Sequence, residues 1–433
     1  QGGGAGLRDF WDRWCTNPLF AGGFIWVYCD EAPKRSDKGG ILDSDKSNAP
    51  DGVVGPRREK EGSYYAIRAQ WSPIQLKPLL ITNHFDGSFL LTNEYTFTNL
   101  KDCRMSYKVL TCGTPLQGNT ETGKVIAEGG VQLPSINPGE TGTARFELPD
   151  SFREGDILEL EAFDKEGKSI CNWTYPIHLV KRYFERKLTQ AAPTPAPPKA
   201  EARQTADAIE LKSSKVCVTF DAATGMIRHI TSGETEVPFK DGPVAVGMKM
   251  RYEPSLSYTR HSSDGAIYCA KYKGAADSIV WRLTNEGLLY MDAILLNRGS
   301  GGSGFDDAFM DSQIFNLGLT FSYPEQNCSG MKWMGRGPYR VWKNRIAGTN
   351  YGIWNKDYNN TITGESFENL IYPEFKGYHA NLYWATLEGE KTSFTVYSRN
   401  DGIFFRVFTP EEPAGRVKDT MPAFPEGDLS FLL

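Results

Sequence analysis

Residues 1–75 alternate between helical and strand-like hydrophobic patterns. Apolar side chains recur at the spacing of one helix face over 7–14, a continuous apolar run follows at 24–29, and a second helical pattern over 64–71 ends before Pro73. Helix, strand, long loop and helix in succession are typical of an α/β domain. A closed β/α barrel needs about 250 residues, so this segment predicts only one end of such a barrel.

Residues 76–187 change to short strand-like runs separated by turn sequences such as Asp86-Gly87 and Lys165-Glu-Gly. The strand-like runs lie at 79–82, 89–97, 105–110 and 157–163. Strands at this spacing over about 110 residues predict an immunoglobulin-like β-sandwich.

An Ala/Pro-rich segment at 188–206 predicts an extended, semi-rigid linker and marks the clearest domain boundary. Residues 207–433 are again rich in strand-like runs and predict one large antiparallel sandwich. The chain closes with a strand-like run at 429–433. A sandwich without its final strand exposes an unpaired edge, so we expect the last strands of this domain, like the first part of the barrel, to be missing.

The composition narrows the possible partners. The chain has a net charge of −5 without long charged blocks, which argues against nucleic acid as a partner. It contains no run of about 18 apolar residues, so no membrane span is expected. Its 12% aromatic content, with 44 Gly and 25 Pro, suits both β-sandwiches and sugar-binding surfaces. Eight scattered cysteines and only five histidines predict neither a zinc site nor a disulfide framework.

Several motifs occur in a fixed order along the chain. They are Gly22–Glu31 (GGFIWVYCDE), Ala49–Tyr65 (APDGVVGPRREKEGSYY), Trp71–Ile74 (WSPI), Phe220–Ile227 (FDAATGMI), Gly242-Pro243 and Trp333–Tyr339 (WMGRGPY). Together they resemble family 2 glycoside hydrolases of the β-galactosidase type. The resemblance implies a mainly β multidomain protein: the C-terminal end of a (β/α)8 catalytic barrel, then an immunoglobulin-like β-sandwich, then a large antiparallel supersandwich.

The resemblance also implies an enzyme, a retaining glycoside hydrolase that acts on terminal β-galactosides or related β-glycosides. Retaining glycosidases need two carboxyl groups about 5–5.5 Å apart, and in this family both are glutamates on earlier barrel strands. Residues 1–21 contain no glutamate, so we assign no catalytic residue and expect this chain to be inactive alone. We expect no cofactor or metal within it, and magnesium or sodium is implied only for the complete enzyme.

Three departures from the family pattern leave the sugar and the linkage open. The family's Trp-Asp-Trp signature is Trp26-Val-Tyr28 in this chain, and Gly242-Pro243 is not followed by the usual Trp-Arg-Ala-Pro-Thr-Asp motif. The Gly-Arg-Gly-Pro run continues as Tyr339-Arg instead of the usual His/Gln-Glu-Asn. These changes put a lactose-type specificity in doubt.

The resemblance places three substrate-binding residues in the barrel end. Trp26, at the C-terminal end of a barrel strand, faces the active-site mouth and can stack on a pyranose; the alternative is a core tryptophan between barrel and helix. Asp30 either contacts a sugar hydroxyl or anchors a loop. Asp51 corresponds to a sugar- or sodium-contacting position, although Asp-Gly is also an ordinary turn.

Other residues carry weaker signals. Arg57 and Arg58 could pair with a carboxylated sugar or form surface ion pairs. Trp333, Trp342 and His379 are interpreted as structural. A second hypothesis is a non-catalytic carbohydrate-binding or scaffolding protein that binds sugar through Trp342 or Trp354. Under the first hypothesis we expect a carbohydrate substrate, and analogy with the family allows a homo-oligomer. The sequence does not give the compartment, although a bacterial glycan-degrading parent favours a periplasmic or extracellular location over a cytoplasmic one.

Overall fold

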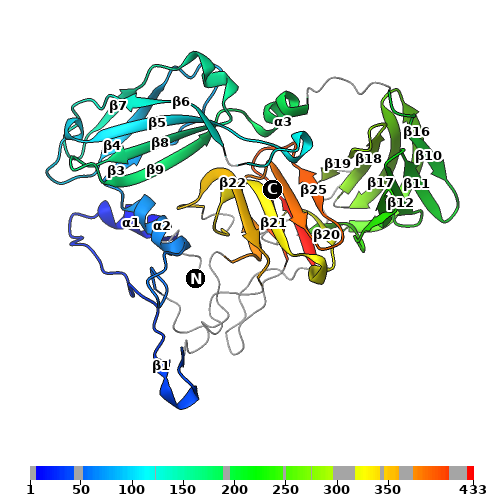
Figure 1. Ribbon diagram of the computed structural model, residues 1–433, viewed down its shortest axis with the longest axis horizontal. Helices are drawn as coiled ribbons and strands as arrows, with labels where there is room; N and C mark the ends of the chain where they lie inside the picture. Colours follow the sequence, from blue (N-terminus) through cyan, green and yellow to red (C-terminus); the bar gives the residue numbers. More distant parts are fainter. Residues whose placement is uncertain are drawn as a thin grey trace, which may run out of the picture.

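The computed structural model describes residues 6–42, 52–121, 123–188, 196–246, 250–274, 276–295, 317–341, 346–359, 374–408 and 427–433. Strands dominate these residues and gather into several separate sheets, while no barrel is closed. A small N-terminal segment, a β-sandwich and a larger group of four sheets follow one another along the chain (Figure 1). The predicted mainly β, multidomain fold is therefore confirmed.

The N-terminal segment contains both predicted helices. They are α1 (Leu7–Cys15) and α2 (Gly62–Gln70), with the two-stranded ribbon β1 (Lys34–Arg35) and β2 (Ile41–Leu42) between them. Helix α1 lies against α2 through the rings of Trp11 and Trp71, whose centroids are 5.1 Å apart. No residue of α1 is buried, so its apolar face remains largely open among the described residues.

The strand predicted at 24–29 is not formed as such. Among the described residues this run has one bridge, a parallel one between Cys29 and Val54. A strand is stabilised by hydrogen bonds to neighbours on its edges, and only the last residues of the run have such a neighbour. The prediction of a strand at 24–29 was therefore wrong for this structure.

The second part is a two-sheet sandwich. Its strands are β3 (Ile74–Leu76), β4 (Ser88–Asn93) and β7 (Thr141–Arg145) in one sheet, and β6 (Lys124–Val131), β5 (Arg104–Thr111), β8 (Ile157–Phe163) and β9 (Ser169–Pro176) in the other. Leu158, Leu160 and Ala162 alternate along β8 and are fully buried, as expected for a strand with one face toward the core. The predicted strand at 79–82 was wrong: after the Lys77 amide donates to Leu90 O, Pro78 has no N–H to continue the ladder.

A helix that the sequence analysis missed joins the two large parts. Helix α3 (Val180–Leu188) follows β9 and lies between the sandwich and the four-sheet part (Figure 1). Tyr183 and Phe184 are buried in a core that also includes Cys112 of the sandwich and Trp384 of the C-terminal part. The Tyr383 hydroxyl donates to His178 O at 2.7 Å. The two parts therefore share a continuous apolar core.

The C-terminal part consists of four antiparallel sheets. The first two are β10 (Glu201–Gln204), β11 (Ala208–Lys212), β12 (Val216–Asp221), β13 (Ile227–Ser232) and β14 (Thr235–Val237), and β16 (Met250–Ser262), β17 (Gly265–Gly274), β18 (Ala276–Thr284) and β19 (Leu289–Leu295). The other two are β15 (Asp241–Val246), β20 (Gly318–Ser322), β27 (Asp428–Leu432), β26 (Phe404–Val407) and β23 (Gly377–His379), and β22 (Asn350–Asp357), β21 (Gly330–Gly337), β24 (Trp384–Glu388) and β25 (Phe394–Tyr397).

Two features of this part refine the sequence interpretation. Strand β10 lies inside the range 188–206 predicted as a linker and pairs with β11 in register. The strand-like run at 429–433 forms most of β27, which is paired on one side with β20 and on the other with β26. This strand therefore lies inside its sheet, and the expectation that further strands are missing stays a prediction.

The cysteines behave as predicted for a chain without a disulfide framework. All eight are free. Burial raises the pKa of the Cys112 and Cys328 thiols to about 12 and that of Cys171 to about 11, which keeps these thiols protonated and unreactive at neutral pH. Cys15 differs from the others because it is exposed.

His379 is a structural core residue, as predicted. Its ring is 1% exposed, lies edge-on to Trp333, and places Nε2 3.2 Å from Phe375 O. Burial lowers the pKa of His379 to about 4, whereas a histidine in an unfolded chain titrates near 6.5. The folded protein therefore holds this ring neutral over a range in which the unfolded chain binds a proton.

This difference predicts a pH-dependent stability. As the pH falls from about 6.5 toward 4, the unfolded state takes up a proton that folded His379 does not, so the free energy of unfolding should fall, by about 2 kcal/mol between pH 7 and pH 5. The variant His379→Gln keeps a neutral N–H donor but cannot take up a proton. Urea denaturation at pH 7 and pH 5 should therefore show that its free energy of unfolding falls by about 2 kcal/mol less than that of the wild type. The exposed-site variant His84→Gln should keep the wild-type loss; an unchanged loss in His379→Gln would contradict the prediction.

Candidate functional site

The barrel-end segment exposes a row of aromatic side chains. Phe24 is fully exposed, Trp26 is 79% exposed and Tyr28 is 63% exposed. Exposed apolar groups that lie close together mark a surface that binds a ligand or another polypeptide. Both interpretations of Trp26, stacking on a sugar and packing between barrel and helix, stay predictions, because the described residues form no closed barrel around this side chain. The peptide bond between Trp26 and Val27 is cis.

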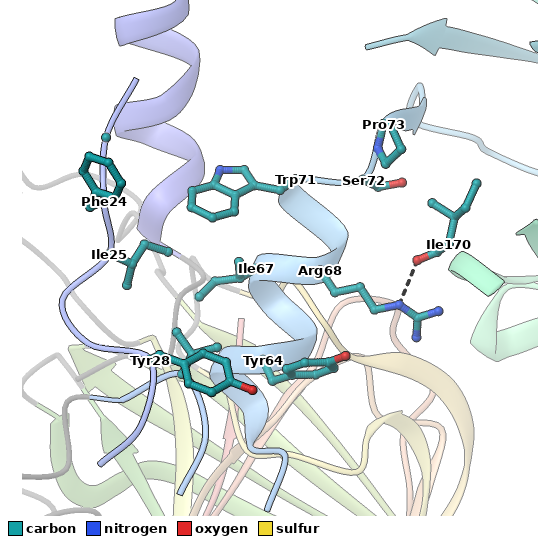
Figure 2. A pocket seen from close by; sticks show the side chains of 12 residues that line it. Phe24, Ile25, Tyr28, Tyr64, Ile67, Arg68, Trp71, Ser72, Pro73 and Ile170 are labelled. Carbon is teal, nitrogen blue, oxygen red and sulfur yellow. Dashed lines mark hydrogen bonds between the residues drawn. The ribbon is translucent and has the colours of Figure 1, made fainter. Parts of the chain in front are cut away.

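An apolar groove of about 520 Å³ lies between this segment, helix α2 and strand β9. Phe24, Ile25 and Tyr28 form one wall, and Ile67 of α2 and Trp71, which directly follows this helix, face them (Figure 2). Trp26 is not among the residues that line the groove. The groove and the exposed indole are therefore neighbouring but separate features.

Asp30 lies at the other end of the run and is only 4% exposed. Its Oδ1 accepts a hydrogen bond from the Gly52 amide at 2.6 Å, and its own amide donates to Val54 O at 3.0 Å. These contacts describe the loop-anchoring alternative of the sequence analysis. A sugar contact by the same carboxylate stays a prediction, and Asp51, the third predicted residue, lies outside the described residues.

The two arginines of the predicted segment are on the surface. Arg58, which has a positive φ of 68°, places its guanidinium 5.9 Å from the centre of the Tyr28 ring. Arg57 is exposed, and its amide donates to Glu59 Oε2 at 2.8 Å. Arg58 therefore has a stacking role beside the exposed aromatic row, which the sequence did not indicate.

Both large parts of the chain hold helix α2 in place. On one side, the Arg68 guanidinium donates to Ile170 O at 2.8 Å (Figure 2). It also donates to Ser169 Oγ at 2.8 Å. On the other side, Tyr339 of the Gly-Arg-Gly-Pro loop stacks against Tyr65, with ring centroids 5.3 Å apart, and its hydroxyl donates to Lys60 O. The loop therefore acts on the barrel end by packing against its last helix.

Gly348, in the segment 346–349, also approaches helix α2 closely. Its φ is +83°, and a Cβ at this position would lie 2.4 Å from the amide nitrogen of Ala66 in α2. A contact this close is available only to glycine. Neither Gly348 nor Tyr339 was assigned this role from the sequence.

Trp333, which was interpreted as structural, is buried in the core as predicted. The second hypothesis names Trp342 and Trp354 as sugar-binding residues. Trp354 is half-buried and donates from its indole nitrogen to Gly335 O at 3.1 Å, and its ring packs closely on Gly337. Trp342 lies outside the described residues. Trp354, the described one of the two, is therefore held in place by contacts within its own sheet.

Among the described ranges, no group of three or more His, Cys, Asp or Glu side chains lies close enough together to hold a metal ion. Within those same ranges, no helix has the length and apolar character needed to cross a membrane.

Two family models match the chain, and each range lies within one of the two large parts of the structure. Residues 89–173 match the model described as "Beta-galactosidase, domain 4", and residues 248–407 match the model described as "Beta galactosidase small chain". The chain belongs to the β-galactosidase type of family 2 glycoside hydrolases. In this family the sandwich is therefore the fourth domain, and the four-sheet part contains the small-chain domain.

A curated relative agrees with this assignment. A β-galactosidase of Actinobacillus pleuropneumoniae is 24% identical over 162 residues, which are 36% of this chain and 14% of that protein. The chain thus corresponds to a small share of the length of the β-galactosidase that it matches.

Solved structures of an exo-chitosanase of Amycolatopsis orientalis also overlap with this chain. One, described simply as the exo-chitosanase, has a TM-score of 0.16, and another, described as an exo-β-D-glucosaminidase with bound inhibitors, has a TM-score of 0.17. In both, the identity is 10% and the overlap covers 56% of this chain and 29% of the other. At TM-scores this low the overlap supports no conclusion about chemistry.

Proposed function

We propose that this chain is the part of a retaining β-glycosidase that forms one wall of the sugar site, and that the complete enzyme hydrolyses terminal β-galactosides or closely related β-glycosides. The observation that carries the proposal is the exposure of Trp26. This indole lies in the run that resembles the last strand of the family's catalytic barrel, and it is 79% exposed.

Physical chemistry supports a sugar at this position. In β/α barrels the active site lies at the C-terminal ends of the strands. One face of a galactopyranose is rich in C–H groups, so an indole stacked on it buries apolar area and also fixes the orientation of the ring. The neighbouring Tyr28, which is 63% exposed, extends the aromatic surface.

The reacting carboxylates belong, in this proposal, to polypeptide other than the present residues. Retention requires a nucleophile and an acid/base separated by about 5–5.5 Å. The first glutamate of the sequence is Glu31, which follows the aromatic run, and the Asp30 carboxylate is bound to the Gly52 amide. We therefore expect this chain to contribute sugar binding and support, and to show no turnover by itself.

The test uses the complete product of the gene and the present chain side by side. The complete product should hydrolyse an aryl β-galactoside with the β-anomer as the first product seen by NMR, and the chain alone should not. Trp26→Ala in the complete product should lower kcat/KM by about 10- to 100-fold, equivalent to about 1.4–2.7 kcal/mol. Trp14→Ala, which removes another exposed indole, should leave kcat/KM unchanged.

Three results would contradict parts of the proposal. An inert aryl β-galactoside combined with turnover of an aryl β-glucuronide would remove the galactoside assignment. Unchanged kinetics in Trp26→Ala would remove the role of the indole. If the gene product proved to have no hydrolase activity but its tryptophan fluorescence changed on titration with galactose, the non-catalytic carbohydrate-binding hypothesis would replace the enzyme.

A further inference from the structure

Two segments far apart in the sequence are joined next to the exposed indole. The Val53 amide donates to Val27 O at 3.0 Å, and the Val54 amide donates to Tyr28 O at 3.0 Å. The Asp30 amide returns a bond to Val54 O at 3.0 Å, and its Oδ1 accepts from the Gly52 amide at 2.6 Å. Of these bonds, only the last uses a side chain, and that side chain is buried.

Glycine is the only residue type that lets position 52 come this close to Asp30. A Cβ at position 52 would lie 2.3 Å from the Asp30 amide nitrogen and 2.7 Å from its Oδ1. Atoms essentially never come this close, so any larger residue would push the two segments apart. The packing is tight on the apolar side as well, because Val54 is 2% exposed.

The exposed indole depends on this junction. Because most of its surface is open, the ring of Trp26 has little packing of its own to hold it, and its position follows from the backbone that carries it. That backbone is fixed from Val27 onward by the bonds to residues 52–54. A binding group must be held to within about 0.5 Å by its supporting contacts to act well, and a buried carboxylate bonded to an amide is a strong contact of that kind.

We propose that Asp30 is a positioning residue: its carboxylate holds segment 52–54 against residues 27–30 and so fixes the place of Trp26. The value of this placement for sugar binding rests on the proposed function of Trp26. Asp30 then acts through the indole and not through a contact of its own with the substrate.

The experiment observes Trp26 directly in the full chain. Incorporation of 5-fluorotryptophan gives ten fluorine resonances for the ten tryptophans, and the signal that disappears in Trp26→Phe belongs to Trp26. In Asp30→Ala the Trp26 resonance should broaden or split while the other nine stay in place. Asp30→Asn should restore one narrow resonance, because the amide oxygen still accepts from the Gly52 amide.

Two glycine variants test the contact between Asp30 and Gly52 by changing residue 52 or, as a control, residue 130. Gly52→Ala should disturb the Trp26 resonance as Asp30→Ala does. Gly130→Ala, at a glycine with no atom within 4 Å of an added Cβ, should leave all ten signals unchanged. An undisturbed Trp26 signal in Asp30→Ala, or an equal change in all ten signals, would overturn the proposal.

The two proposals can fail separately. If Asp30→Ala disturbs the Trp26 resonance but Trp26→Ala leaves kcat/KM of the complete gene product unchanged, Asp30 is a positioning residue and the sugar role of Trp26 is lost. If Trp26→Ala lowers kcat/KM but Asp30→Ala leaves the resonance unchanged, the sugar role stands and the positioning role is overturned.

Discussion

Replacing Arg406 with methionine should lower the free energy of unfolding by about 3–5 kcal/mol. The Arg406 guanidinium and Asp428 carboxylate are 2.6 Å apart in neighbouring strands, with 3% and 0% of their side chains exposed. Ser430 Oγ also donates to Asp428 Oδ2 at 2.7 Å. Without the guanidinium, the carboxylate stays buried with its negative charge uncompensated, and this cost exceeds the attraction that the pair provided.

Urea denaturation followed by circular dichroism measures the effect as a lower midpoint at constant slope. The matched control is Arg399→Met. Arg399 pairs with Asp292 at 3.1 Å, but the two side chains are 47% and 67% exposed, so solvent screening limits its loss to about 1 kcal/mol. The double variant Arg406→Met/Asp428→Leu should recover most of the stability, because no unpaired charge remains buried. Equal losses in the two single variants would contradict this account.

Trp384→Ala should cost about 3–5 kcal/mol and should also separate the unfolding of the sandwich from that of the C-terminal sheets. Trp384 is fully buried in the core that α3 completes with Tyr183 and Phe184. Polar contacts cross the same boundary, including the bond from the Val180 amide to Asp401 Oδ1 at 2.8 Å. The wild-type chain should therefore unfold these two parts together, because each covers apolar surface of the other.

Differential scanning calorimetry distinguishes the two outcomes. Trp384→Ala should show two transitions where the wild type shows one for the coupled parts. Trp281→Ala removes a similarly buried indole, 4% exposed, from a core inside the C-terminal part. It should lower the free energy of unfolding by a similar amount, while the sandwich and the C-terminal sheets still unfold together. A single transition in Trp384→Ala would mean that the shared core does not couple the two parts.

Periodicity predicted elements whose stability comes from local pattern or one buried face. Helices α1 and α2 and strand β8 are examples, since each has its apolar residues at the spacing of its own structure. Helix α3 carried the same signal: Val180, Tyr183 and Phe184 stand at i, i+3 and i+4. It was missed because the surrounding 110 residues were interpreted as a single all-β unit.

The candidate site was less accessible from the sequence. The resemblance to the family indicated Trp26, and the pattern of the run alone did not, because exposure and burial look alike in a continuous apolar segment. The contact between Asp30 and Gly52 joins positions 22 residues apart through an irregular segment, and no periodic pattern predicts such a pairing. The support that Tyr339 and Gly348 give to α2 spans an even longer separation and depends on the tertiary fold.

The place of β27 has a consequence for biosynthesis. Strand β20 gains its second neighbour only when residues 428–432 have left the ribosome, about 100 residues after β20 itself. At translation rates of about 5–20 residues per second, one side of β20 and of β26 stays uncovered for about 5–20 s and about 1–4 s respectively. Nascent chains stalled before residue 428 should therefore expose unpaired strand edges and recruit chaperones until β27 is inserted.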